Sequence, residues 1–360
     1  MKPSSGLTST NQVAPPPRVL CISLGSIGRR HLRNLRTLLP KAHIGVYRQH
    51  TATDALPDGA DEVLCDMEQA LAFAPDAVFI SSPASEHLAN ALPFVARNVP
   101  LFLEKPLAAS ADQLGDFAAR CERSNGFTMV GYVLRFLPAL HAVRKCLKNG
   151  TLGVVHTARI EVGQYLPDWR PDSDYRQGVT AQRKLGGGAL LELSHEIDYA
   201  TWLFGWPQTL QCSSARLSAL EIDVEDSAHL VLEYANKRVN IQLDLLQRVA
   251  TMAVQIVGSH ATLMVDLLRE QVKLIEPMCP HGRLLEHPVL PDSNDIYLRQ
   301  FDFFLTRAIA GYRPAYSETE GFADWSNVES AGRVLELIDL AKQASATGMR
   351  QSVPFAEAMV

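Results

Sequence analysis

The first third of the chain alternates short apolar runs with amphipathic segments. Apolar runs such as Arg18–Gly25 and Asp76–Pro83 are separated by segments of helix length, for example Arg29–Leu39, whose apolar residues recur every three or four positions. Continuous apolar strands joined by such helices are typical of parallel βαβ units with a sheet covered on both faces. The pattern predicts an α/β domain with a doubly wound parallel sheet of the Rossmann type over residues 17–135.

The rhythm changes in the second part of the chain. After a predicted helix at Ala139–Lys148, β-rich runs lie close together, and turn signals such as "ANK" and "GSH" join neighbours, which favours an antiparallel sheet. The predicted strands fall at 154–164, 209–218, 227–235, 238–246, 251–258 and 261–268. Two helical patterns follow, at about Asp295–Ala310 and Trp325–Ala346.

We therefore predict a second domain over residues 136–360, an α/β unit with an open, predominantly antiparallel sheet. Its final helices are candidates to pack back on the first domain. Residues 1–16, rich in proline and small polar residues, are interpreted as a disordered leader. Two domains fit a length of 360 residues, because a single core usually stops growing at roughly 250 to 300 residues.

Composition narrows the kinds of partner. A formal net charge of -5 argues against a nucleic-acid surface. No apolar run approaches the roughly 20 residues that span a bilayer, and the leader lacks the apolar centre of a signal peptide. The six cysteines are scattered without a C-x-x-C pair, which suggests neither disulfides nor zinc. We expect a cytoplasmic protein that binds small molecules, not nucleic acid or membranes.

The stretch "ISLGSIGRRHLRNL" lies where the first predicted strand meets the first predicted helix. In a nucleotide-binding turn, Gly25 would let the backbone approach a pyrophosphate and Gly28 would let helix and strand pack closely. Ser23 stands where the usual pattern has its first glycine, and we expect it to make the turn with a negative φ. The predicted cofactor contacts here are Ser23, Gly25, Ser26, Ile27 and Gly28. The alternative is a β-to-α turn without a ligand.

The second strand ends with Tyr47 and Arg48 instead of an acidic residue. An acidic residue at this place usually binds the ribose hydroxyls of NAD, whereas an arginine accommodates the 2′-phosphate of NADP. Arg48 therefore favours NADP over NAD. The alternative is a solvated loop charge, or an arginine that stacks on adenine without discriminating between the two.

Two later strand ends add candidate residues at the same edge of the sheet. "FISSPASEH" supplies Ser82, Pro83 and His87, and "FLEKP" supplies Glu104, all predicted to contact the cofactor. Lys105 of the second stretch would stand at the carboxyl edge, where open α/β sheets bind ligands.

The stretch "LGGGALLELSHEIDYATWLFG" is a glycine-rich entry into a helix. Glu192, His195 and Tyr199 follow at i, i+3 and i+7, so on one helix they share a face, which is either exposed to solvent or lines a cleft. A lone histidine is more often structural than catalytic. The three glycines before the helix nevertheless allow the backbone to come close to another group, as a site would require. No metal is expected, because "HEIDY" is not H-E-x-x-H and no second histidine stands at ligand spacing.

A loop-like run, Gln164–Gly178, interleaves aromatic and charged residues. The aromatic rings suit stacking on sugar C–H surfaces, and the arginines suit a phosphate or carboxylate on the substrate. The alternative is an oligomer-contact loop, and for Arg135 a domain-boundary ion pair. The predicted substrate contacts are Arg135, Tyr165, Asp168, Trp169, Arg170, Tyr175, Arg176 and Tyr199.

The S-x-G-x-x-G turn, "EKP", "GYVLRF" and "GGGALLELSHEID" together resemble the Gfo/Idh/MocA family of oxidoreductases. The resemblance implies hydride transfer between a nicotinamide and a sugar or polyol carbon, and a homodimer or homotetramer formed through the C-terminal sheet. Lys105 resembles the family's lysine that contacts the reacting hydroxyl, and His195 its acid/base histidine. Glu192 stands near the family's aspartate, but three positions before the histidine where inositol dehydrogenases have four.

These expectations combine into an NAD(P)-dependent sugar dehydrogenase or reductase. A neutral His195 would take the hydroxyl proton and the Lys105 cation would stabilise the alkoxide, with Glu192 as a third catalytic candidate. A phosphorylated, nucleotide-linked or acidic sugar is the expected substrate. Two alternatives stay open: a non-catalytic sensor of the same fold, and a redox-neutral enzyme that holds its cofactor permanently.

Overall fold

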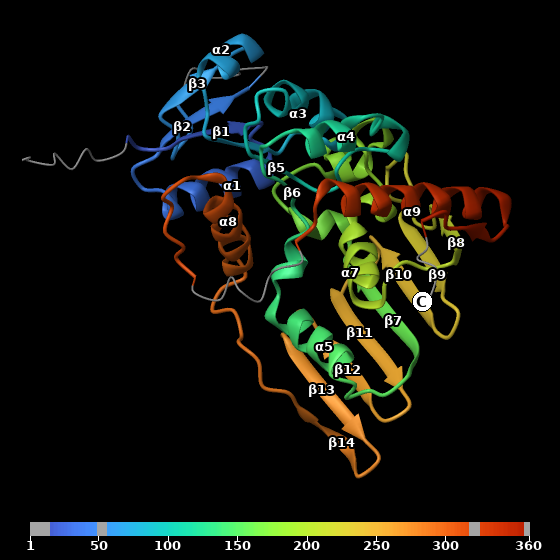
Figure 1. Ribbon diagram of the computed structural model, residues 1–360. Coiled ribbons are helices and arrows are strands. Elements are labelled where there is room, and N and C mark those ends of the chain that lie inside the picture. The colour runs from blue at the N-terminus through green and yellow to red at the C-terminus, as the bar shows by residue number, and fades with distance from the viewer. Residues whose placement is uncertain (1–14, 49–55, 317–324, 356–360) are drawn as a thin grey trace, which may run out of the picture.

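The computed structural model describes residues 15–48, 56–316 and 325–355, and the predicted leader lies almost wholly outside them. Its first sheet is parallel throughout, with the strand order β3-β2-β1-β4-β5-β6 (Figure 1). The strands are β1 (Arg18–Ile22), β2 (His43–Tyr47), β3 (Glu62–Leu64), β4 (Ala77–Ile80), β5 (Leu101–Leu103) and β6 (Thr128–Val130). The predicted doubly wound sheet is confirmed.

Helices cover both faces of this sheet, as its wholly buried strands β4 and β5 require. They are α1 (Ser26–Leu38), α2 (Met67–Ala72), α3 (His87–Val95) and α4 (Phe117–Arg123). The strand order reverses between β1 and β4, so a crevice opens beyond the carboxyl ends of these strands. The residues that follow β1, β4 and β5 meet at this crevice.

The second sheet has nine strands in the order β14-β13-β12-β11-β7-β10-β9-β8-β15. β7 and β10 pair in parallel and the other pairs are antiparallel, which confirms the prediction of a predominantly antiparallel sheet. The strands are β7 (Val155–Gly163), β8 (Thr209–Ala215), β9 (Ser227–Glu233), β10 (Arg238–Asp244), β11 (Thr251–Gly258), β12 (Thr262–Asp266), β13 (Gln271–Glu276), β14 (Cys279–Leu284) and β15 (Gln351–Ser352). The last three strands were not predicted from the sequence.

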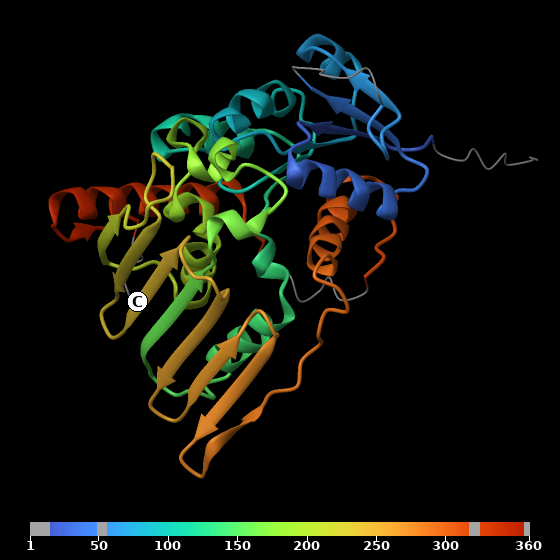
Figure 2. The ribbon, with the colours of Figure 1, turned by 180° about the vertical axis from the view of Figure 1, so that it is seen from behind.

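One face of the nine-stranded sheet packs against helices α5 (Pro138–Lys148), α6 (Ala189–Glu192) and α7 (Ser194–Phe204). Figure 2 looks onto the opposite face, which no helix of the described chain covers. Short 3₁₀ turns connect the elements around the site. They are η1 (Ala84–Glu86), η2 (Ala111–Gln113), η3 (Val133–Phe136), η4 (Leu166–Trp169), η5 (Tyr175–Gln177), η6 (Val179–Ala181) and η7 (Arg183–Leu185).

The last two helices are α8 (Asp295–Ala308) and α9 (Val328–Thr347). α8 lies beside α1 in both views (Figures 1 and 2) and α9 contacts both β6 and β8. Ring centroids of Phe301 on α8 lie 4.8 Å from Phe79 and 5.0 Å from Phe102. These aromatic rings form a core that joins α8 to the first sheet.

Within the described ranges, no helix has both the length and the apolar character needed to cross a bilayer.

Candidate active site

The turn between β1 and α1 is held to the neighbouring strand, because the backbone N–H of Ser23 donates to the carbonyl oxygen of Tyr47 at 3.0 Å. Ser23 has a φ of 70°, which corrects the expectation of a negative φ. The chain reverses so sharply here that the residue adopts the left-handed conformation that a glycine adopts freely. For serine this conformation costs on the order of 1 kcal/mol.

The two glycines of the turn have different surroundings. A Cβ added to Gly28 would lie 2.5 Å from the carbonyl oxygen of Ser23, so only glycine lets α1 pack this closely on the turn. A Cβ added to Gly25 would meet nothing within 4 Å. The first turn of α1 carries no acidic residue and no side-chain cap, so its N–H groups, starting at Ser26 and Ile27, are suited to an anion.

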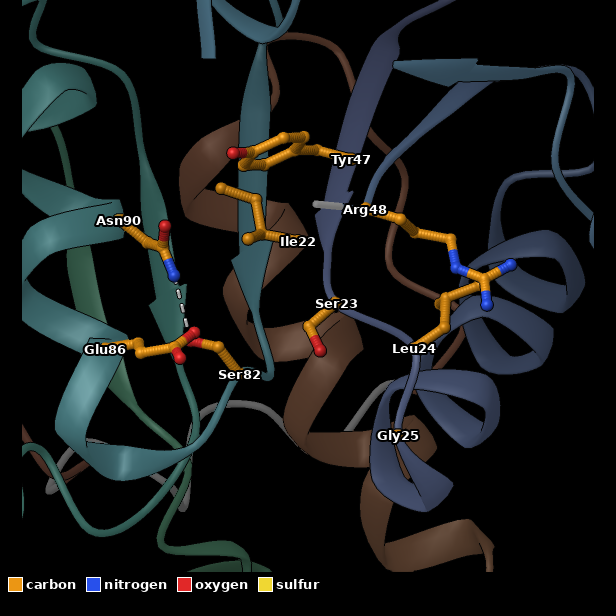
Figure 3. Close-up of a pocket in the computed structure, with 9 residues that line it drawn as sticks. All are labelled: Ile22, Ser23, Leu24, Gly25, Tyr47, Arg48, Ser82, Glu86 and Asn90. Carbon is orange, nitrogen blue, oxygen red and sulfur yellow. Dashed lines mark hydrogen bonds between the residues drawn. The ribbon is translucent and has the colours of Figure 1, made fainter. Parts of the chain in front are cut away.

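A cavity of about 330 Å³ lies beside this turn (Figure 3). Its lining residues are Ile22, Ser23, Leu24, Gly25, Tyr47, Arg48, Ser82, Glu86 and Asn90. Sequence reasoning named Ser23, Gly25, Arg48 and Ser82 among them, and Pro83 directly follows the last of these. A ligand here would contact the ends of three neighbouring strands at once.

Two polar residues of the cavity were missed from the sequence. Glu86 ends η1, and Asn90 on α3 donates from Nδ2 to the Ser82 hydroxyl at 3.1 Å. In Figure 3 both lie on the side opposite Arg48. Polar residues near the start of a helix are usually exposed. The one sequence signal for Glu86 and Asn90 is that they follow the "SSP" strand end by only a few positions.

Arg48 directly follows β2, and its backbone N–H donates to the carbonyl oxygen of Leu64 at 3.1 Å. Its side chain points along the rim of the cavity beside Leu24 (Figure 3). Residues 49–55 lie outside the described chain. In the part of the chain that is described, the charged residue that follows β2 is thus Arg48 and not an acidic residue.

His87 and Glu104 are not among the residues that line this cavity, and their contact with the cofactor stays a prediction. The ring of His87 is buried, with Nδ1 2.9 Å from the carbonyl oxygen of Pro106 and Nε2 2.7 Å from that of Ser82. Burial lowers the pKa of this imidazole, and the hydrogen bonds only partly oppose that effect. The Glu104 carboxylate is buried against His31 of α1. Position at a strand end does not fix the direction of a side chain.

Lys105 extends from the end of β5 into the second domain. Its Nζ donates to the backbone carbonyl of Glu192 at 2.6 Å and lies 3.3 Å from Glu192 Oε1. The Thr180 hydroxyl donates to the other carboxylate oxygen at 3.0 Å, a contact that the sequence did not suggest. Burial alone would raise the pKa of the Glu192 carboxyl, but the Lys105 charge and these hydrogen bonds hold it below its ordinary value.

The predicted single helix is broken in the structure. α6 ends at Glu192, Leu193 has φ -96° and ψ 30°, and α7 begins at Ser194. The shared face predicted for Glu192, His195 and Tyr199 is therefore wrong. Tyr199 is fully buried and its hydroxyl has no hydrogen-bond partner among the described residues, and its contact with the substrate stays a prediction.

His195 stands at the start of α7 beside Lys105. Burial, together with the positive charge of Lys105, lowers the pKa of its imidazole well below the ordinary 6.5. The ring of Tyr132 meets the imidazole edge to face, with centroids 5.6 Å apart. Lys105, which follows β5 of the first sheet, therefore lies near enough to His195 on α7 for its charge to act on the imidazole.

The glycine-rich entry brings the backbone of the second domain against the first. A Cβ added to Gly186, whose φ is 87°, would lie 3.1 Å from the Cβ of Ala84 and 3.2 Å from that of Ala109. Both alanines belong to loops at the carboxyl edge of the first sheet. This close contact places Glu192 and His195 opposite Lys105.

Several predicted substrate residues are engaged elsewhere. Arg135 forms a buried two-point ion pair with Asp198, through distances of 2.8 and 2.7 Å, which is the alternative that its sequence context suggested. Arg176 pairs with Asp174 at 2.8 Å and with Glu221 at 2.7 Å. The structure therefore gives these two guanidinium groups carboxylate partners within the chain.

The aromatic residues of the loop are partly engaged as well. Hydrogen bonds join Trp169 Nε1 to the carbonyl oxygen of Gln164 and the Glu221 N–H to the Tyr175 hydroxyl, both at 3.2 Å. Arg248 lies 3.5 Å from the ring centre of Tyr165 and 3.7 Å from Asp168.

Arg170 is exposed, and its charge contributes to lowering the pKa of Glu192. Of the predicted loop arginines, Arg170 is the one whose charge acts on the Lys105–Glu192 pair.

The described residues contain no group of three His, Cys, Asp or Glu side chains placed to hold a metal ion. The open turn at Gly25, the helix start without a cap and the adjoining cavity together fit a dinucleotide. The Rossmann-type parallel sheet, the second, mostly antiparallel sheet and this site define a dinucleotide-binding protein.

Comparison with protein families places this class more closely. Residues 18–132 match the model described as "Oxidoreductase family, NAD-binding Rossmann fold", and residues 140–264 match the GFO/IDH/MocA C-terminal domain. The chain belongs to the Gfo/Idh/MocA family of NAD-binding oxidoreductases.

Similar curated proteins match over only part of their length. The rhizopine catabolism protein MocA of Rhizobium meliloti is 30% identical over 37% of this chain and 39% of its own. The trans-1,2-dihydrobenzene-1,2-diol dehydrogenase of Xenopus tropicalis is 26% identical over 45% of this chain and 47% of its own. The chain thus matches less than half the length of either relative.

Solved structures match nearly whole. A levoglucosan dehydrogenase in complex with NADH superposes with a TM-score of 0.79 at 18% identity, over 94% of this chain and 99% of the other. GenD2 from gentamicin A biosynthesis, in complex with NAD, gives 0.74 at 21% identity over 93% and 96%. At such identities these structures support the fold alone.

Proposed function

We propose that the protein is an NAD(P)-dependent dehydrogenase or reductase acting on the secondary alcohol or ketone of a sugar or sugar derivative. The observation that carries this proposal is the meeting of Lys105, from the first domain, with Glu192 and the neighbouring His195 of the second. A site that only senses a cofactor has no need for a partly buried cation beside a neutral imidazole.

The first domain would hold the dinucleotide. The first turn of α1 would bind the pyrophosphate through backbone N–H groups, in the space left open at Gly25. Ser82 and Asn90, hydrogen-bonded to each other, would line its path across the strand ends. A bound nicotinamide supplies the hydride acceptor or donor for the reaction.

The second domain would provide the group that accepts the hydroxyl proton of the substrate. His195 is neutral at physiological pH because burial and the Lys105 charge both disfavour its protonation, so it can accept the hydroxyl proton of the substrate. The ammonium of Lys105 would stabilise the negative charge that develops on the same oxygen. Glu192 and Thr180 hold that ammonium in place, which makes Glu192 a positioning residue in this proposal.

Two features support a sugar bearing a negative charge. Arg170 is exposed and acts electrostatically on Glu192, so its charge reaches the site from the side of the loop. The structures that share this fold include WlbA from Bordetella pertussis with NADH and UDP-GlcNAcA, at a TM-score of 0.72 and 17% identity. That complex concerns the other protein, and a charged sugar is our proposal for this one.

Arg48 supports NADP as the preferred cofactor. It stands at the end of β2 on the rim of the cavity, where the 2′-phosphate of NADP would meet a guanidinium. NAD remains the alternative cofactor, and titration with both distinguishes them.

We further propose that the uncovered face of the nine-stranded sheet joins two copies of the chain. This face carries a groove of about 730 Å³, and Met264, Leu268 and Leu284 on it are each about half exposed. Exposed apolar side chains gathered in this way are typical of an interface. A Met264→Glu variant should lower the mass measured by light scattering to that of a smaller oligomer.

The activity is tested by a screen. Purified protein is offered NAD, NADP and their reduced forms with neutral, acidic, phosphorylated and nucleotide-linked sugars, and absorbance of the reduced nicotinamide is followed. Lys105→Met should abolish turnover on any sugar that reacts, whereas Lys342→Met on α9 should not. Equal turnover by the Lys105→Met variant and the parent would contradict the proposal.

A further inference from the structure

A buried contact joins the cofactor helix to the residue before the catalytic lysine. His31, on α1, is 1% exposed, and its Nε2 lies 2.5 Å from Oε1 of Glu104. The other carboxylate oxygen of Glu104 accepts the backbone N–H of Lys105 at 3.0 Å. One carboxylate therefore links α1 to the backbone of Lys105.

The imidazole of His31 is held in one orientation by aromatic rings. Its centroid lies 5.7 Å from that of Phe102 on β5, and 6.2 and 4.7 Å from those of Tyr297 and Phe301 on α8. Three rings from two elements leave the imidazole little freedom to rotate. The direction of its Nε2 toward Glu104 is thus fixed by packing.

The hydrogen-bonding partners of His31 indicate which nitrogen carries the proton. Nδ1 is buried and has no hydrogen-bond partner in the described chain, so a proton there would be an unsatisfied donor. The tautomer with the proton on Nε2 instead donates to the Glu104 carboxylate. Glu104 then has one donor for each oxygen: the imidazole and the Lys105 amide.

We propose that His31 is a positioning residue for Lys105. It holds the Glu104 carboxylate, which holds the Lys105 backbone, so the lysine keeps the placement from which its ammonium reaches Glu192. His31 lies one turn beyond Gly28, whose close packing already seats α1 on the glycine turn, so the buried pair of His31 and Glu104 is left to fix the place of the catalytic ammonium. This inference rests on the proposed function, since it requires Lys105 to act in turnover.

Three variants test the proposal. His31→Leu keeps an apolar side chain among the rings but removes the donor, and it should lower kcat by about 10-fold to 100-fold, the scale expected for a small displacement of a catalytic group. His31→Gln keeps an N–H donor of similar reach and should restore most of the lost rate. Phe304→Leu on α8 is the matched control for damage to the aromatic core, because the Phe304 ring contacts Phe79 and Phe102 and, among the described residues, makes no ring contact with His31.

Two readouts separate positioning from general damage. The dissociation constant of the cofactor should change little in His31→Leu while kcat falls. Hydrogen exchange of the Lys105 amide should become about 10-fold faster in His31→Leu, because its acceptor is no longer held. The same amide should exchange at the parent rate in Phe304→Leu.

The outcomes are distinct. Equal losses of kcat in His31→Leu and Phe304→Leu, no rescue by His31→Gln, or unchanged exchange of the Lys105 amide would each overturn the positioning role. If Lys105→Met itself turned over sugar at the parent rate, the proposed function would fail instead.

Discussion

Replacing Glu196 by glutamine should give the protein a stability advantage over the parent that grows as the pH rises. Glu196 follows His195 on α7, is 1% exposed, and has one carboxylate oxygen without a hydrogen-bond partner among the described residues. Burial raises the pKa of its carboxyl from 4.5 to about 8. The folded protein therefore keeps this proton over a range of pH in which the unfolded chain has lost it.

The sign and size of the effect follow from that difference. The stability that Glu196 contributes is fully present below pH 4.5 and is lost as the pH rises toward 8. Within this window the free energy of unfolding falls by about 1.4 kcal/mol for each pH unit. The fall becomes smaller near pH 8, because the carboxyl then begins to ionise in the folded state as well. The parent therefore loses about 2 kcal/mol of unfolding free energy between about pH 6 and about pH 8. Glutamine does not titrate and escapes the loss.

The assay is differential scanning calorimetry of parent and variant at both pH values. The melting temperature of Glu196→Gln minus that of the parent should increase by a few degrees from about pH 6 to about pH 8. Comparing the same difference at two pH values removes the constant effect of exchanging a carboxyl for an amide. Glu122→Gln, on the exposed side of α4, is the control and should show no such increase. A difference for Glu196→Gln that is equal at both pH values would refute the reasoning.

Other predictions concern the cofactor and the base. Gly28→Ala places a Cβ 2.5 Å from the Ser23 carbonyl oxygen, which should destabilise the fold by about 1 to 3 kcal/mol in denaturant unfolding and weaken cofactor binding. Arg48→Asp should shift the ratio of NADP to NAD dissociation constants toward NAD by about 10-fold to 100-fold, the value of one charged hydrogen bond, and an unchanged ratio would contradict its role. Because the pKa of His195 is well below 6.5, kcat/KM for alcohol oxidation should stay level down to that pH and fall only in more acidic buffer. A fall centred at or above 6.5 would contradict a depressed pKa.

The sequence predicts what depends on local pattern. Buried strands, the glycine turn and the edge position of Lys105 follow from apolar runs and from the rule that parallel strands end at one edge. Gly28 is a clear example, because any strand and helix packed this closely leave no room for a Cβ at this position. Strand β13 and the edge strand β14 were missed because their sequence is interrupted by polar residues and a short turn.

The remaining features depend on tertiary contacts. The helix breaks at Leu193 between two helix-forming segments, so no local signal marks the break that separates Glu192 from His195. Glu104 and His87 turn toward buried partners distant in sequence, namely His31 and the carbonyl oxygen of Pro106. Such directions are set by which groups the fold brings within hydrogen-bond distance.

In the proposed mechanism, Lys105 and His195 act on one oxygen of the substrate. The most direct test is a double-mutant cycle of kcat/KM with Lys105→Met, His195→Ala and the double variant, on whichever sugar the screen identifies. Groups that act as a unit give strongly non-additive losses, so the double variant should be about as slow as the slower single variant. If the two losses multiply in the double variant, the groups act independently and the central claim is contradicted.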